Sequence, residues 1–121
     1  MKLAIVVLIS AAVMSPLALG ASSSPASQFA VEDQFVAAAN RGDYATVCRL
    51  YSSHYLRASQ KSCRALYRWG ASIYGPYDYR IVRRRNVAGG HRHVDLILWR
   101  HASFIEVAHE RAGWRIVAGG F

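Results

Sequence analysis

The chain has 121 residues, a length that allows one domain with a single hydrophobic core. Hydrophobic residues make up 53% of the chain and charged residues 18%, a balance that excludes an intrinsically disordered protein. The formal net charge of +8 favours acidic partners or surfaces. No motif in the sequence names a reaction, so the composition leaves both a binding module and an enzyme open.

The first 20 residues have the pattern of an export signal. Lys2 precedes a nearly continuous apolar run over residues 3–14, and the small residues Ala18 and Gly20 suit a signal-peptidase site. Residues 1–20 are therefore predicted to be a signal peptide that is removed on export. The alternative is an uncleaved membrane anchor, although the run is short for a bilayer span. The predicted location is secreted or periplasmic, with no membrane span after cleavage.

Three helices are predicted after this signal. Apolar residues at helical spacing begin near Gln28, and the acidic pair Glu32-Asp33 is expected in the opening turn, where carboxylates oppose the positive end of the helix dipole. Gly42 is expected to end this helix in a left-handed conformation. Asp43 is predicted to cap the second helix and Ser59 the third.

After Pro76 the apolar period changes from about 3.6 residues to 2, which is the signature of strands. Four strands are predicted. The first begins at Tyr77 and ends at a hairpin turn at Gly89-Gly90, and the second follows that turn. The third covers residues 104–110 and the fourth residues 114–118. This order predicts an α+β fold in which N-terminal helices pack on a curved antiparallel sheet. Residues 21–27, which are small, polar and proline-broken, are predicted to be a flexible leader to a single domain over 28–121.

Three stretches of the chain have the pattern of a known fold family. They are FVAAANRGDYATVCRLYSSHY at 35–55, the meander from Tyr77, and AGWRIVAG at 112–119. Together they resemble the nuclear transport factor 2-like superfamily, a cystatin-like cone that includes SnoaL-like proteins, ketosteroid isomerases and small secreted bacterial domains. The resemblance implies this cone fold and places the chain with the small secreted bacterial branch.

Enzymes of that superfamily use a carboxylate or a His-Asp pair inside the cone, often with tyrosines that donate to a developing oxyanion. These residue types are supplied here by Asp95, Glu106, Tyr44, Tyr51 and Tyr55, of which Asp95 and Tyr51 are the catalytic candidates. No position matches a motif of a particular enzyme branch, so the resemblance transfers no catalytic residue. The alternative is that Asp95 faces solvent and the tyrosines fill the core.

Cys48 and Cys63 are the two cysteines of the chain. An even count in an exported protein predicts that they pair, which would join the second and third predicted helices. Closing a loop of about 15 residues contributes roughly 3 kcal/mol in the chain-entropy model. The alternative is two buried thiols.

Two polar patterns lie in the first two predicted strands. One pattern is a run of candidates for binding an anion, either a small ligand or an anionic envelope component: Arg80, Arg83, Arg84 and Arg85. Nucleic acid is not expected as a partner. The alternative is an ordinary solvated strand face. The spacing His91-x-His93-x-Asp95 places alternate side chains about 6.6 Å apart on one face, but a polar strand produces the same pattern, so no metal site and no cofactor is predicted.

The sequence thus predicts an exported, noncatalytic binding or accessory domain of unknown ligand. The alternative is a small-molecule isomerase or dehydratase-like enzyme that uses Asp95 and a tyrosine of the cone. A homodimer is also predicted, since the second strand carries apolar residues on both faces and dimers of the resembled superfamily commonly pack sheet against sheet. Its contact is expected to include Ile97 and Trp99, with Arg83 and Arg85 toward the rim.

Overall fold

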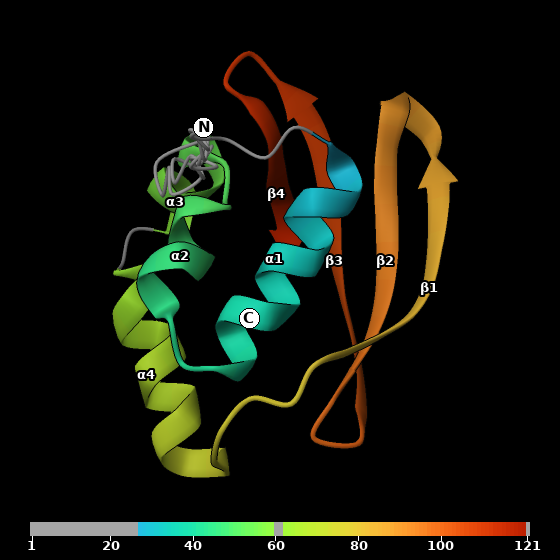
Figure 1. Cartoon of the computed structure of the whole chain (residues 1–121). Helices are drawn as coiled ribbons and strands as arrows, with labels where there is room; N and C mark the ends of the chain where they lie inside the picture. Colours follow the sequence, from blue (N-terminus) through green and yellow to red (C-terminus); the bar gives the residue numbers. More distant parts are fainter. Residues whose placement is uncertain (1–26, 60–61, 121) are drawn as a thin grey trace, which may run out of the picture.

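A helical layer packs against a four-stranded antiparallel sheet (Figure 1). The computed structural model describes residues 27–59 and 62–120. Its helices are α1 (Gln28–Asn40), α2 (Tyr44–Arg49), α3 (Ser53–Ser59) and α4 (Cys63–Tyr74). Its strands, which neighbour one another in sequence order, are β1 (Arg80–Val87), β2 (His91–Leu98), β3 (His101–Glu110) and β4 (Gly113–Gly119). The predicted α+β fold is confirmed.

The predicted signal peptide, and the predicted leader apart from Ser27, lie outside the described residues. Among the helices of the described ranges, each falls short of the length and apolar character needed to cross a membrane.

Side-chain caps set the starts of α1 and α2. Ser27 Oγ accepts a hydrogen bond from the backbone N–H of Ala30 at 3.2 Å, and Asp43 Oδ1 accepts one from Thr46 at 3.1 Å. Between the two helices Gly42 has φ 79°, a left-handed conformation that glycine adopts without a steric penalty. The predicted cap at Asp43 and the predicted break at Gly42 are both confirmed.

The third predicted helix is α4, which begins at Cys63 with Ser62 as its cap; Ser62 Oγ accepts from the backbone N–H of Ala65 at 3.3 Å. The short helix α3, which ends at Ser59, precedes it and is not among the predicted helices. The prediction that Ser59 caps α4 is wrong, because Ser62 offers the same capping chemistry one turn later. Gly75 ends α4 with φ 93°.

The predicted disulfide between Cys48 and Cys63 is present, with an S–S distance of 2.01 Å and a Cα–Cα distance of 5.9 Å. It joins α2 to the first residue of α4. The bond therefore fixes the start of α4 to the rest of the helical layer.

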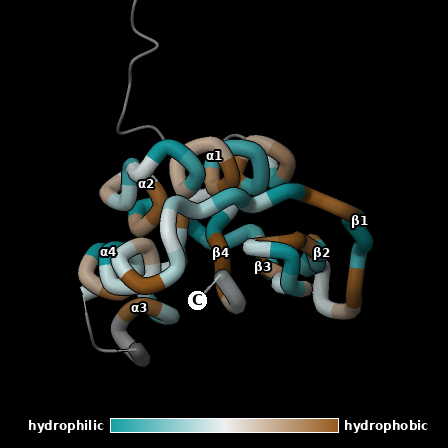
Figure 2. Tube along the Cα trace, turned by 90° about the horizontal axis from the view of Figure 1, so that it is seen from below, coloured by the Kyte–Doolittle hydropathy of each residue, from teal (hydrophilic) through white to brown (hydrophobic). Residues whose placement is uncertain are grey.

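The core lies between the helices and one face of the sheet. Figure 2 shows α1 lying over this face, with α3 and α4 to one side of β4. Val31 and Phe35 of α1 are fully buried, as are the sheet residues Val94, Ile105, Val107 and Ile116. Because strand side chains alternate between faces, the residues between these, such as Asp95 and Ile97 in β2, lie on the outer face.

β1 begins at Arg80, three residues later than predicted. The backbone of Tyr79 is bonded instead to a side chain of α1: its N–H donates to Asn40 Oδ1 at 2.7 Å, and its carbonyl accepts from Asn40 Nδ2 at 2.9 Å. Tyr77 and Tyr79 are buried as the alternation predicts, but they are outside the strand ladder.

The two edges of the sheet are built differently. At the β4 edge the Ile116 N–H donates to the Leu50 carbonyl and the Ser52 N–H donates to the Ile116 carbonyl, both at 2.8 Å. At the opposite edge, β1 has an irregularity in its pairing with β2 between Ile81 and Arg83. A segment of the helical layer therefore covers one edge, and a bulge interrupts the other.

Candidate functional site

Buried tyrosines fill the interior of the cone beside the end of β4. Tyr51 Oη lies 2.8 Å from Tyr67 Oη and donates to the Gly119 carbonyl at 2.8 Å. The hydroxyls of Tyr67 and Tyr79 both donate to the Gly120 carbonyl, at 2.7 and 2.9 Å. These hydroxyls therefore hold the segment after β4 inside the fold.

Burial raises the pKa of each of these tyrosines well above its ordinary value. Burial, with the neighbouring Tyr44, also raises the pKa of Tyr77 to about 12. All four are neutral at physiological pH, so they can donate hydrogen bonds to backbone carbonyls. Gly120 is required at its position, because it has φ 84° and a Cβ there would lie 2.0 Å from Tyr51 Oη.

Asp95, the other catalytic candidate, lies on the outer face of the sheet and not with Tyr51. Its Oδ2 is 3.1 Å from Arg83 Nε and 3.5 Å from Arg85 Nε, and its Oδ1 is 3.2 Å from His93 Nε2. Desolvation raises the pKa of Asp95, but the hydrogen bonds from the two arginines lower it, and the resulting pKa is below the ordinary value of an aspartate. The structure thus does not bring together the carboxylate and the tyrosine named from the sequence.

The four candidate anion-binding arginines are likewise divided. Arg83 and Arg85 point to the outer face, where both contact Asp95, whereas Arg84 points to the helical layer. Arg80 is exposed at the start of β1. Successive strand residues face opposite ways, so a run of arginines in one strand supplies two faces and not one patch.

The two histidines of β2 bind a carboxylate of β3. His91 Nδ1 lies 2.9 Å from Glu106 Oε1, and His93 Nδ1 lies 3.5 Å from Glu106 Oε2. The hydrogen bond from His91 is the main cause that lowers the pKa of Glu106. Within residues 27–59 and 62–120 no group of three or more ligating side chains is placed to hold a metal ion.

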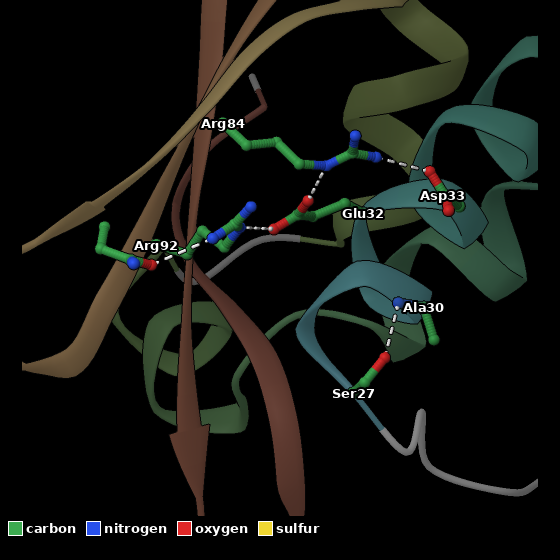
Figure 3. A network of polar contacts seen from close by, with 7 residues as sticks. Ser27, Ala30, Glu32, Asp33, Arg84 and Arg92 are labelled. Carbon is green, nitrogen blue, oxygen red and sulfur yellow. Dashed lines mark hydrogen bonds and ion pairs between the residues drawn. The ribbon is translucent and has the colours of Figure 1, made fainter.

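A carboxylate is buried on the helix side of the sheet (Figure 3). Glu32 is 0% exposed; its Oε1 pairs with Arg84 Nε, and its Oε2 lies 3.3 Å from Arg92 Nε. Arg84 also reaches Asp33 Oδ1 at 2.8 Å. The ring of Phe29 covers both arginines, with its centroid 4.5 Å from Arg92 Cζ and 5.5 Å from Arg84 Cζ.

Burial raises the pKa of Glu32, and the two arginines oppose that rise. The network ties α1 to β1 and β2. The predicted role of Glu32-Asp33 at the helix dipole is wrong, because α1 begins at Gln28 and its first turn contains no acidic residue. Residues more than 50 positions apart form this network, and no local pattern in the sequence indicates such a pairing.

An apolar pocket lies between α4 and the β2–β3 turn. Its volume is about 180 Å³, larger than an engineered cavity of about 150 Å³ that binds benzene. Two of its aromatic side chains, Trp69 and Tyr74, are 60% and 62% exposed. The lining residues are Leu66, Trp69, Gly70, Tyr74, Tyr77, Tyr79, Leu98, Trp99 and Gly120.

The wall formed by Trp99 depends on a strained turn. Trp99 and Arg100 have φ values of 50° and 71°, a region that residues other than glycine rarely adopt. The Trp99 N–H donates to Asp78 Oδ1 at 2.7 Å, and its indole Nε1 donates to the Pro76 carbonyl at 2.8 Å. Its ring lies 4.9 Å from that of Tyr77. The prediction that Trp99 shares the outer face with Ile97 is therefore wrong, because the turn directs the ring toward α4.

Searches with protein-family models and against curated proteins find no match. Among solved structures, one from Thiobacillus denitrificans, provisionally named as a calcium/calmodulin-dependent protein kinase type II association domain, is similar to this chain with a TM-score of 0.55. The sequences are 21% identical over 80% of this chain and 94% of the other. Helices packed on an antiparallel meander, together with this similarity, give the chain the nuclear transport factor 2-like fold.

Proposed function

We propose that this chain is an exported, noncatalytic binding module that holds a small apolar or aromatic molecule between α4 and the β2–β3 turn. One observation carries the proposal: the pocket there is open and aromatic, and among the residues that the structure describes its lining contains no carboxylate, histidine, lysine or arginine. Apolar walls with few polar atoms are typical of small-molecule sites. General acid-base catalysis needs an ionisable group at the substrate, and the hydroxyls of Tyr77 and Tyr79 already donate to backbone carbonyls.

Export is part of this proposal. The pattern of residues 1–20 and the Cys48–Cys63 disulfide support a secreted or periplasmic location, where disulfides persist. We place the chain with the small secreted branch of the nuclear transport factor 2-like proteins on the same two grounds.

The alternative is an isomerase or dehydratase-like enzyme. It would require Asp95 and a tyrosine such as Tyr51 to face one cavity. The contacts of Asp95 with Arg83 and Arg85 on the outer face favour the binding module over this enzyme.

The pocket is tested with 4-fluorotoluene as the probe, observed by fluorine NMR. The full chain is expressed in a host that exports it, and the exported protein is purified. Its intact mass then reports whether residues 1–20 are removed. We expect saturable binding that Trp69→Ala weakens by about tenfold, because the variant loses an aromatic wall. Val82→Ala is the matched control, since Val82 is 58% exposed on β1, away from the pocket. No saturable binding, or equal loss in both variants, would contradict the proposal.

We also propose that the chain self-associates through the outer face of the sheet. Phe104 of β3 is 40% exposed on this face and is a diagonal cross-strand neighbour of Ile97 in β2. Arg83 and Arg85 lie on β1, which pairs with the other edge of β2. The similar structure is itself named an association domain. We expect a dimer by light scattering at tens of micromolar, and a monomer for Phe104→Glu, which buries a charge at the contact. A monomeric wild type rejects this contact.

A further inference from the structure

The side of α4 next to the pocket carries a stripe of exposed apolar side chains. Leu66, Trp69 and Ile73 are three and four residues apart, so they lie on one side of the helix, and they are 39%, 60% and 51% exposed. Tyr74 adds a second exposed aromatic ring at the end of α4. Monomeric proteins rarely leave such contiguous apolar surface in water unless it contacts a partner.

The same end of the molecule carries arginines without an ion pair. All seven Asp and Glu side chains have a polar contact in the structure. Four of them, Glu32, Asp33, Asp43 and Asp95, pair with Arg41, Arg83, Arg84, Arg85 and Arg92. Within the described part of the chain, six exposed arginines have no ion-pair partner: Arg49, Arg64, Arg68, Arg80, Arg100 and Arg111. Three of them, Arg68, Arg80 and Arg100, each directly precede or follow a residue that lines the pocket.

We infer that this end of the molecule, defined by Leu66, Trp69, Ile73, Tyr74 and the arginines 68, 80 and 100, docks on the surface of an anionic lipid bilayer. Trp69, Tyr74 and Ile73 enter the boundary between headgroups and acyl chains, where tryptophan and tyrosine are favoured. The arginines lie close enough to the same end to meet lipid phosphates while their stems cover apolar surface. Because Ile73 does not line the pocket, the inference does not require the pocket to hold a ligand.

Charge distinguishes this occupant from a second copy of the chain. A two-fold contact through this end would bring the unpaired arginines of one copy near those of the other. α4 has no carboxylate, and Asp78, which accepts from the Trp99 N–H, can offset one of the three positive charges at most. An anionic surface supplies the missing charge. An uncharged apolar partner would leave the arginines without a role.

The test is sedimentation of the exported protein with large vesicles of phosphatidylcholine, with or without one third phosphatidylglycerol, followed also by tryptophan emission. We expect binding and a blue shift with the anionic vesicles and little of either with phosphatidylcholine alone. Ile73→Glu should weaken anionic-vesicle binding by about tenfold or more, since a carboxylate cannot enter the apolar boundary. Arg100→Gln and Arg80→Gln should each weaken it by about fivefold. All variants keep the same N-terminus, so differences among them report this surface.

Val82→Glu is the control, because Val82 is slightly more exposed than Ile73, at 58% against 51%, but lies outside the docking surface. It should leave vesicle binding unchanged, and Ile73→Glu should leave 4-fluorotoluene binding unchanged. Equal binding to both kinds of vesicle, equal loss in Val82→Glu, or a dimer that Ile73→Glu converts to a monomer without vesicle binding would each overturn the inference. Failure of the proposed pocket function would appear separately, as loss of probe binding with vesicle binding intact.

Discussion

Arg84→Met is expected to lower the free energy of unfolding by about 3 kcal/mol at about pH 8, because it leaves the Glu32 carboxylate buried without its nearest cation. We take the lower end of the range for broken buried pairs, since Arg92 remains 3.3 Å from Glu32. Methionine keeps most of the apolar stem, so the change isolates the charge. The measurement is chemical denaturation followed by circular dichroism.

The sign of the pH dependence follows from Glu32. Burial raises the folded-state pKa of this carboxyl, so its contribution to stability is full below the unfolded pKa and is lost as the pH rises through the folded pKa. Removing Arg84 raises the folded pKa further and enlarges that loss. The difference between variant and wild type should therefore shrink toward about pH 4, where Glu32 is protonated in both.

Arg83→Met is the matched control for Arg84→Met. Arg83 is the preceding residue of β1 and also pairs with a carboxylate, but its side chain is 64% exposed on the outer face. Exposed pairs contribute about 0 to 1 kcal/mol, so this variant should be close to wild type. Equal effects of the two substitutions, or a loss for Arg84→Met that does not change with pH, would contradict a structural role for the buried pair.

Replacing both cysteines, in Cys48→Ala/Cys63→Ala, is expected to lower the free energy of unfolding by roughly 3 kcal/mol. The disulfide closes a loop of 15 residues and so restricts the unfolded chain. It also anchors the start of α4, whose later turns supply Trp69 and Tyr74 to the pocket. Probe binding should therefore weaken along with stability.

Reductant supplies the control for the disulfide. Wild type in dithiothreitol should approach the stability of the double variant, and the double variant should not respond to the reagent. A wild-type stability that is the same with and without the bond, once free thiols are confirmed by alkylation, would contradict the prediction.

Much of the fold could be predicted because its signals are local. The change of apolar period after Pro76, the cap at Asp43 and the glycine pair at 89–90 each depend on neighbouring residues alone. The start of the third predicted helix could not be predicted, since Ser59 and Ser62 have the same capping chemistry and only tertiary packing chooses between them. The late start of β1 depends on Asn40, which is 39 positions away from Tyr79.

The candidate site was less accessible to sequence reasoning. The pocket combines residues of α4, the β2–β3 turn and the segment after β4. The turn places Trp99 and Arg100 in a left-handed conformation, which neither residue type favours, so the sequence does not predict it. The split of the arginines was within reach, because strand alternation alone places Arg84 opposite Arg83 and Arg85. Their carboxylate partners, Glu32 and Asp95, come from different elements and required the three-dimensional structure.

The two edges of the sheet have a consequence for how the protein behaves when crowded. A strand edge with free backbone groups is a template onto which another molecule can add a strand, and long assemblies grow in this way. The backbone of residues 50–52 already occupies the β4 edge. At the β1 edge the bulge disturbs the spacing that an added strand must match. Fibrillar growth is thus opposed at one end of the sheet by the chain's own backbone and at the other by the geometry of β1.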